Sequence, residues 1–355
     1  MSSRDVSRVA AHMLTGLELP GGWLVVEKVE RAKDATGGNF SVGYIVERKR
    51  GKAFLKALDY SFAFSSDNTA QILEAMTSAH NFEVEVLGHC AQRRMDRIVL
   101  ALDQGELVVD GAEGFGNVSY LIFELADGDI RHALASIGAA FDYAWTLRML
   151  HHAAGGLWQM HRGGLAHQDL KPSNVLTFGP ASSKLGDLGR ASRRDVAAPH
   201  DGLTCAGDPQ YAPPELLYRH VPKDWAARRQ ACDMYLLGSL AMFAFSGASA
   251  TAAILAYVPD AQRPQNWADS YSAVLPHLRV AFARAVDEFE SGLPVALVSE
   301  LVPMVRQLCD PDPTLRGHPR TRAMRNATPF SLERYVSQLD LLARRAEIGL
   351  YRDVA

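Results

Sequence analysis

Short runs of hydrophobic residues, several of them alternating with polar ones, dominate the chain between residues 23 and 125. Such runs, separated by turn residues, predict short β-strands at 25–29, 42–47, 53–58, 98–102 and 119–124. One stretch, 69–92, differs because its apolar residues recur at three- and four-residue intervals, which is typical of an amphipathic helix. This part of the chain therefore predicts a small sheet with one helix.

After residue 127 the apolar periodicity becomes helical. It predicts helices at 131–137, 143–161, 232–246, 279–291 and 298–309. Strands followed by helices indicate an α+β fold. We divide the chain into an extension over 1–22, a strand-rich lobe over 23–126, a helical lobe over 127–326 and a helical tail over 327–355.

The stretch 234–259 carries no charge and is long enough to suggest a membrane span. Glycines and a Ser-Gly-Ala-Ser sequence interrupt it, so we predict a buried core helix followed by a turn of small residues. Residues 1–20 lack the apolar segment of a signal peptide. We therefore expect a cytoplasmic protein with no membrane partner.

The composition describes an ordinary globular protein, with 48% hydrophobic and 22% charged residues. A length of 355 residues suits two lobes better than one core. The net charge of −3 gives no reason to expect a nucleic-acid partner. Four cysteines without CxxC spacing are typical of free thiols in a reducing compartment.

Residues 167–174 read His-Gln-Asp-Leu-Lys-Pro-Ser-Asn and bring together the groups that phosphoryl transfer requires. Asp169 offers an acid that can orient a hydroxyl, Lys171 a cation that offsets phosphate charge, and Asn174 an amide oxygen that can hold a metal ion. Thirteen residues after Asn174 comes Asp187, a second acid, followed two residues later by a glycine.

These two motifs, in this order, resemble the catalytic loop and the metal-binding loop of protein kinases. Residues 167–174 are similar to the pattern HRDLKPxN, and a lysine two residues after the acid, Lys171, resembles the eukaryotic-like serine/threonine branch of the family. The resemblance covers residues 23–316. It implies a bilobal protein-kinase fold, with a small antiparallel-sheet N-lobe carrying one helix and a larger helical C-lobe.

The resemblance also assigns roles in the helical lobe. Asp169 would take up or orient the substrate proton, Lys171 would offset charge on the transferred phosphate, and Asn174 and Asp187 would coordinate Mg²⁺. Asp233 would hold the backbone of the catalytic loop.

Two further segments, 207–215 and 310–316, resemble the family's GTPxYMAPE and DPxxR signatures. They imply a buried ion pair between Glu215 and Arg316 that fixes the platform for a protein substrate.

Two positions depart from the family pattern. Gln168 stands where the family has an arginine that pairs with a phosphate on the activation loop, so we expect activity that does not depend on phosphorylation there. Asp208 replaces a threonine whose hydroxyl ordinarily bonds the catalytic acid and lysine. How an acid at this position affects the docking of a peptide stays open.

For the nucleotide, Lys56 in the sequence Ala-Phe-Leu-Lys resembles the lysine that contacts the α- and β-phosphates. Its acidic partner should come from the helix at 69–92. We favour Glu83, because apolar residues follow it at +3, +4 and +7, and keep Glu85 and Glu74 as alternatives.

Residues 36–44 occupy the place of the family's glycine-rich loop. Aligned on Phe40, only Gly38 matches, while Thr36 and Ser41 replace the outer glycines. We include Gly38, Phe40 and Ser41 among the nucleotide-binding residues. The strand at 121–126 resembles the one that leads to the adenine site, where backbone groups of Glu124 and Ala126 would bond the adenine edge.

The resemblance implies an ATP- and Mg²⁺-dependent kinase that phosphorylates serine or threonine in a protein substrate. The changes at Thr36, Ser41, Gln168 and Asp208 motivate a second hypothesis, a nucleotide-binding pseudokinase that acts as a scaffold. A third, a small-molecule kinase, is disfavoured by Lys171, Glu215 and Arg316.

Overall fold

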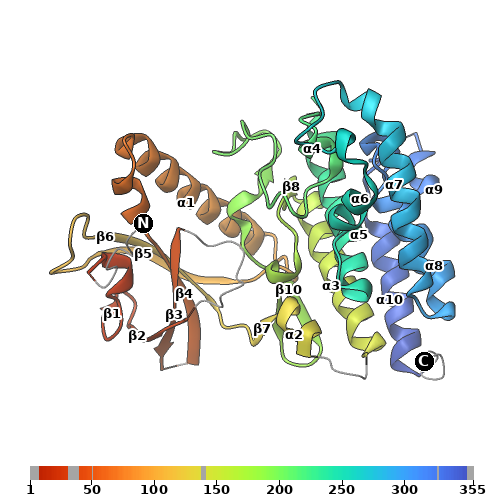
Figure 1. Cartoon of the computed structure of the whole chain (residues 1–355). Helices are drawn as coiled ribbons and strands as arrows, with labels where there is room; N and C mark the ends of the chain where they lie inside the picture. Colours follow the sequence, from red (N-terminus) through yellow and green to blue (C-terminus); the bar gives the residue numbers. More distant parts are fainter. Residues whose placement is uncertain (1–7, 31–39, 50, 137–140, 326–327, 350–355) are drawn as a thin grey trace. The chain divides into compact units, whose positions relative to one another are not determined.

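The computed structural model describes residues 8–30, 40–49, 51–136, 141–325 and 328–349. The chain forms two compact units, drawn in Figure 1 in the colours of the sequence. The smaller unit contains residues 1–92 and 99–126, and the larger contains 93–98 and 127–355.

The smaller unit is built on a six-stranded antiparallel sheet with the order β1-β2-β3-β4-β6-β5. Its strands are β1 (Glu18–Leu19), β2 (Trp23–Lys28), β3 (Ser41–Arg48), β4 (Gly51–Leu58), β5 (Ala101–Val108) and β6 (Asn117–Glu124). Burial alternates along β3, as the sequence pattern predicts for a strand with one face in the core. Tyr44, Leu55 and Ile122 lie at the centre of that core.

The end of the chain before β1 also contributes to this core. Ala10, Ala11 and Leu14 are buried there, and the short 3-10 helix η1 (Ala10–His12) receives a hydrogen bond of 2.8 Å from the Tyr44 hydroxyl to the Ala11 carbonyl. The described part of the segment before β1 thus packs on the sheet.

The α-helix that the structure describes in the smaller unit, α1 (Thr69–Gln92), has the predicted bounds. Phe82, Val86, Leu87 and Cys90 are buried on one of its faces. The strand predicted at 98–102 is displaced, because β5 occupies Ala101–Val108 instead. This strand lies at the edge of the sheet, where polar side chains are tolerated, so hydrophobicity does not mark it.

The larger unit is mainly helical (Figure 1). Its helices are α2 (Ile130–Ser136), α3 (Tyr143–Arg162), α4 (Pro214–Leu217), α5 (Ala231–Ser246), α6 (Ala250–Tyr257), α7 (Tyr271–Ser291), α8 (Val295–Leu308), α9 (Pro319–Arg322) and α10 (Glu333–Glu347). Two small sheets carry the functional loops: β7 (Gly128–Asp129), β9 (Val175–Phe178) and β10 (Ser182–Leu185) form one, and β8 (Leu165–Ala166) with β11 (Ser192–Arg193) forms the other.

The uncharged stretch after residue 233 forms two helices around a turn. Helix α5 is buried on nearly all sides, and Gly247 ends it in the left-handed conformation (φ 76°), which glycine adopts without strain. Among the described residues no single helix is long and apolar enough to cross a membrane. The segments 226–246 and 250–257 reach that length only together, and they are bent by 83°.

The helical tail is part of the larger unit. Helix α10 packs on α3 and buries Leu339, Leu342 and Ala343. Arg148 of α3 donates to Asp340 at 2.7 Å and to Glu347 at 2.8 Å, which fastens the two helices from the side.

Candidate active site

The catalytic loop, residues 167–174, is held at its base by α5. Asp233, fully buried near the start of that helix, accepts hydrogen bonds from the backbone amides of His167 (2.7 Å) and Gln168 (2.8 Å). Gln168 adopts a positive φ of 68°, which is strained for a residue other than glycine. Such strain persists only where surrounding contacts enforce it, and Asp233 supplies these contacts, as the sequence predicts.

His167 joins the catalytic loop to the strand that leads into Asp187. Its Nε2 lies 3.1 Å from the Gly186 carbonyl oxygen, and its Nδ1 accepts the backbone amide of Asp169 at 3.3 Å. Together these bonds fix one tautomer, with the proton on Nε2, and so fix the direction of the ring.

Asn174 is oriented by Asp169. Its Nδ2 donates to the Asp169 carbonyl oxygen (2.7 Å) and to Asp169 Oδ2 (3.1 Å). The amide nitrogen is therefore committed to Asp169, and the amide oxygen, 3.5 Å from the Ser173 hydroxyl, is the atom that can bind a metal ion. Burial raises the pKa of Asp169 above that of an ordinary carboxyl group, while the charge of Lys171 opposes this change.

Lys171 lies between two carboxylates. Its Nζ is 3.3 Å from Asp169 Oδ2 and 3.2 Å from Asp208 Oδ2, and Asp208 also donates its backbone amide to Asp169 Oδ1 at 2.7 Å. Burial lowers the pKa of Lys171, but the two carboxylates outweigh it, so the pKa is raised and the amine stays charged. Asp208 thus links Asp169 to Lys171, a connection for which the resemblance to protein kinases implies a threonine.

Gly207 permits this close approach. A Cβ atom at this position would collide with the Gln168 carbonyl oxygen and lie 2.7 Å from Asp169 Oδ1. Only glycine leaves room for the activation segment, residues 190–215, to run against the catalytic loop. No pattern in the sequence indicates this role for Gly207.

Two oxygen donors that suit a hard cation lie in neighbouring segments. The backbone amide of Gly186 donates to the Asn174 carbonyl oxygen at 2.9 Å, which brings the residue after it, Asp187, next to Asn174. Asp187 is exposed and adopts a left-handed conformation with φ 55° and ψ 72°. A carboxylate and an amide oxygen, completed by phosphate oxygens, form a ligand set that Mg²⁺ accepts, so these residues fit the metal.

The smaller unit places the predicted nucleotide lysine beside one of its three candidate acids. Lys56 Nζ lies 3.0 Å from both carboxylate oxygens of Glu83. Glu83 is buried on α1, whereas Glu74 and Glu85 are exposed. The ion pair therefore involves Glu83, the residue favoured from the apolar pattern.

Four other predicted nucleotide residues that the structure describes in the smaller unit lie at or near strand ends. Ser41 begins β3, and Phe40 before it packs edge-on against Phe62 at 5.0 Å between ring centroids. Gly38 and Thr36 lie outside the described residues. Glu124 ends β6, and Ala126 is the last residue of the unit.

Glu124 also connects β6 to the segment before β5. Its backbone amide donates to the Leu100 carbonyl oxygen at 3.0 Å, and its Oε1 accepts the Leu100 amide at 2.7 Å.

The ion pair expected at the substrate platform is present. Both guanidinium Nη atoms of Arg316 donate to Glu215, each at 2.6 Å, and the two side chains are 0% and 2% exposed. Burial lowers the pKa of Arg316, but the charge and hydrogen bonds of Glu215 outweigh it and raise the pKa. The pair fastens the end of the activation segment to the segment after α8.

A second contact fastens the middle of the activation segment, and no local pattern in the sequence indicates it. Arg229 Nη2 donates to Asp201 Oδ1 at 2.6 Å, and its Nη1 donates to Gln168 Oε1 at 3.2 Å. Gln168 in turn donates from Nε2 to the Arg229 carbonyl oxygen at 2.8 Å. Gln168, which replaces the family's arginine, is thus hydrogen-bonded through both Oε1 and Nε2 of its side chain.

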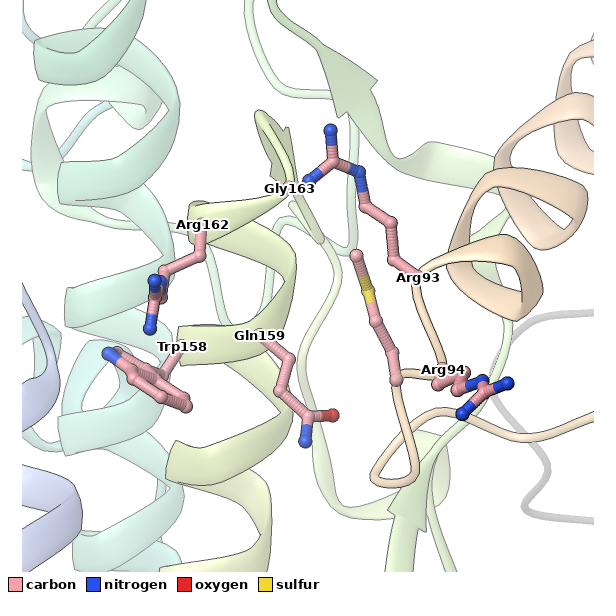
Figure 2. A pocket seen from close by; sticks show the side chains of 7 residues that line it. Arg93, Arg94, Trp158, Gln159, Arg162 and Gly163 are labelled. Atoms are coloured by element: carbon pink, nitrogen blue, oxygen red, sulfur yellow. The ribbon is translucent and has the colours of Figure 1, made fainter.

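A separate hollow of about 270 Å³ lies in the larger unit and contains none of these residues (Figure 2). Its lining includes Arg93, Arg94, Trp158, Gln159 and Arg162. The Gln159 side chain accepts the Arg97 backbone amide at 3.1 Å and donates to Asp96 at 2.5 Å. These bonds explain why residues 93–98 belong to the larger unit although the chain on either side belongs to the smaller one.

Comparison with known proteins agrees with the geometry. The model of the protein kinase domain matches residues 45–319, more than half of the chain. The serine/threonine-protein kinase PknA of Mycobacterium tuberculosis is 28% identical over 215 residues, which are 60% of this chain and 45% of PknA. CBL-interacting protein kinase 4 of Oryza sativa subsp. japonica is 34% identical over 125 residues, 34% of this chain and 28% of that protein.

The serine/threonine-protein kinase H1 of Homo sapiens is 30% identical over 131 residues, 36% of this chain and 30% of that protein. The matched part of PknA is less than half of its length, so the likeness concerns the kinase domain. With a family match over most of its length and a loop in which Lys171 and Asn174 both contact Asp169, this chain belongs to the protein kinase family.

Proposed function

We propose that this protein is a serine/threonine protein kinase that transfers the γ-phosphate of ATP, with Mg²⁺, to hydroxyl groups of a protein substrate. One observation carries the proposal: Asp169 is bonded at the same time to Asn174, Lys171 and the backbone of Asp208. This arrangement holds an acid, a cation and a metal ligand in fixed relation, which is what phosphoryl transfer requires of the protein.

Each residue then has a definite task. Asp169 accepts the proton of the substrate hydroxyl. As it does so, the hydroxyl oxygen bonds to the γ-phosphorus, and the bond between the γ-phosphorus and the oxygen bridging to the β-phosphate breaks. Burial of Asp169 raises its pKa and makes it a stronger base. Lys171 offsets charge on the transferred group, and Asn174 and Asp187 would hold the metal ion. Bound Mg²⁺ would neutralise charge on the phosphates.

The substrate platform supports a protein rather than a metabolite as the phosphate acceptor. Glu215 and Arg316 form a buried bidentate pair at the end of the activation segment, where a polypeptide would dock. A small-molecule kinase has no need of this pair. The names of the mycobacterial and human relatives, both serine/threonine kinases, support the same choice of residue.

We also propose that activity does not depend on phosphorylation of the activation segment. Gln168 is a neutral amide bonded to Arg229 and Asp233, so it offers no cation to a phosphate. The Asp208 backbone amide donates to Asp169 and its carboxylate contacts Lys171, so groups that need no modification hold this end of the segment. Both observations favour a segment that is ordered without a switch.

Transfer of labelled γ-phosphate from Mg-ATP to the protein itself and to a generic basic protein tests the proposal. We expect label with the wild type and none with Asp169→Asn or Lys56→Met. No label in any sample, while ATP still raises the melting temperature, would favour the pseudokinase instead. Label appearing only on compounds of a metabolite mixture would favour the small-molecule kinase.

A further inference from the structure

A single buried guanidinium joins the activation segment to the catalytic loop. Arg229 is 2% exposed and comes from η5 (Ala226–Gln230), a π-helical turn directly before α5. It donates to Asp201 of the activation segment at 2.6 Å and to Gln168 of the catalytic loop at 3.2 Å. Turns of this type are rare and occur frequently at functional sites.

In the catalytic loop, several hydrogen bonds fix the position of the Gln168 side chain. Gln168 returns a hydrogen bond of 2.8 Å to the Arg229 carbonyl oxygen and another of 3.2 Å to Asp233 Oδ1. Gln168 directly precedes Asp169 in the sequence. The guanidinium is therefore connected through one residue to the carboxylate that acts in catalysis.

In the activation segment, hydrogen bonds also fix the position of Asp201. Asp201 Oδ2 accepts the backbone amide of Ala198 at 2.7 Å, which shapes the turn in which Asp201 lies. The neighbouring Arg228 donates to the carbonyl oxygens of Asp201 (2.7 Å) and Leu203 (3.0 Å). Two consecutive arginines thus hold residues 201–203, and one of them neutralises the Asp201 charge.

We propose that Asp201 and Arg229 are positioning residues, a built-in carboxylate–guanidinium pair that holds the activation segment against the catalytic loop. Gly207 and Asp208 follow Asp201 by only six and seven residues, so anchoring Asp201 helps to keep the Asp208 amide on Asp169. Because a carboxylate is charged at neutral pH without modification, the pair needs no kinase upstream to form it. This inference rests on the proposed kinase activity for its catalytic consequence.

Removing the charge of Asp201 leaves Arg229 buried without its carboxylate, which is an unfavourable state for a guanidinium. The segment should loosen, and the Asp208 amide should no longer be held on Asp169. We expect Asp201→Asn to lower kcat by about tenfold or more, since a displacement of about 1 Å in a catalytic group can cost ~10²-fold. Asp201→Glu keeps the charge and should recover most of the rate.

The test compares these two variants with the wild type and with Asp195→Asn, in the full-length chain. Asp195 is an exposed acid of the same segment with a positive φ, a conformation that asparagine also tolerates, so it serves as the matched control. Hydrogen exchange is followed by mass spectrometry in peptides covering residues 198–212, and kcat and KM are measured for a peptide substrate.

We expect faster exchange in residues 198–212 for Asp201→Asn alone. Unchanged exchange in α5 and α8 would show that the fold is intact. Exchange in 198–212 as slow as that of the wild type would overturn the inference, whatever the activity. A segment that loosens while kcat stays the same would overturn the positioning role. If the wild type itself transferred no phosphate, the proposed function would fail, while the exchange result would still decide whether the pair anchors the segment.

Discussion

Asp208 touches both members of the catalytic pair at once: its backbone amide donates to Asp169 at 2.7 Å, and its carboxylate lies 3.2 Å from Lys171. The Lys171 ammonium group therefore contacts two carboxylates at once, those of Asp169 and Asp208. An acid at this position keeps the activation segment attached, but it adds negative charge beside the place where we propose that the phosphate reacts.

Replacing Asp208 by threonine should therefore preserve or raise activity. The hydroxyl can still accept from Lys171, and removing a negative charge that faces the phosphates stabilises the transition state, so we expect kcat to rise by roughly two- to tenfold. Asp208→Ala removes the charge and the contact together and should be slower than Asp208→Thr. Steady-state rates at saturating ATP compare the two, and equal losses in both variants would contradict this role.

Gly207→Ala should reduce catalysis strongly. The added methyl group collides with the Gln168 carbonyl oxygen and crowds Asp169, so the activation segment must move away from the catalytic acid. We expect kcat to fall by about 10²-fold, the cost of a misplaced reacting group. Gly202→Ala is the matched control, because a Cβ at Gly202 has no neighbour within 4 Å. Similar rates for the two variants would show that the close approach is unimportant.

The ion pair between Glu215 and Arg316 should stabilise the larger unit. Glu215→Gln leaves a fully buried guanidinium without its charged partner, and we expect the free energy of unfolding to fall by about 3–5 kcal/mol. Asp287→Asn removes an exposed partner of Arg306 and should cost ~1 kcal/mol or less. Urea denaturation measures both. A loss no larger for Glu215→Gln than for the surface variant would be inconsistent with a buried pair.

The activity should depend on the protonation of Asp169. The carboxylate is the active form, and burial raises its pKa, so activity should be lost on acidification at a higher pH than for an ordinary carboxyl group. Lys171 lowers the pKa of Asp169, and removing its charge in Lys171→Met should move this acid limb to still higher pH. Profiles of kcat against pH test the direction. An acid limb that stays in place or moves to lower pH in Lys171→Met would argue against Asp169 as the base.

The local pattern of hydrophobic residues was sufficient to predict elements and contacts that depend on a single helix or strand. Helix α1 has the predicted bounds because its buried residues follow a helical period. The same pattern favoured Glu83 over Glu85 and Glu74, since the apolar residues at +3, +4 and +7 place Glu83 on the buried face. The start of α7 was missed by eight residues, because Pro276 lies inside the helix and weakens the helical signal.

Contacts between distant segments could not be predicted from local pattern. Asp201 and Arg229 are separated by 28 residues, and nothing in either neighbourhood marks them as partners. Glu215 and Arg316 are 101 residues apart, and only the resemblance to a known family identified them. The requirement for glycine at 207 arises from the packing of the Gln168 backbone against it, which exists only in the folded chain.

We propose above all that this chain is a protein kinase whose activation segment is ordered without phosphate. The most direct measurement is the initial rate of phosphoryl transfer to a serine/threonine peptide library by protein that is phosphate-free by intact mass, before and after incubation with Mg-ATP. Equal rates from the first turnovers would agree with the claim. A lag that disappears as phosphate accumulates on residues 190–212, and that phosphatase restores, would contradict it.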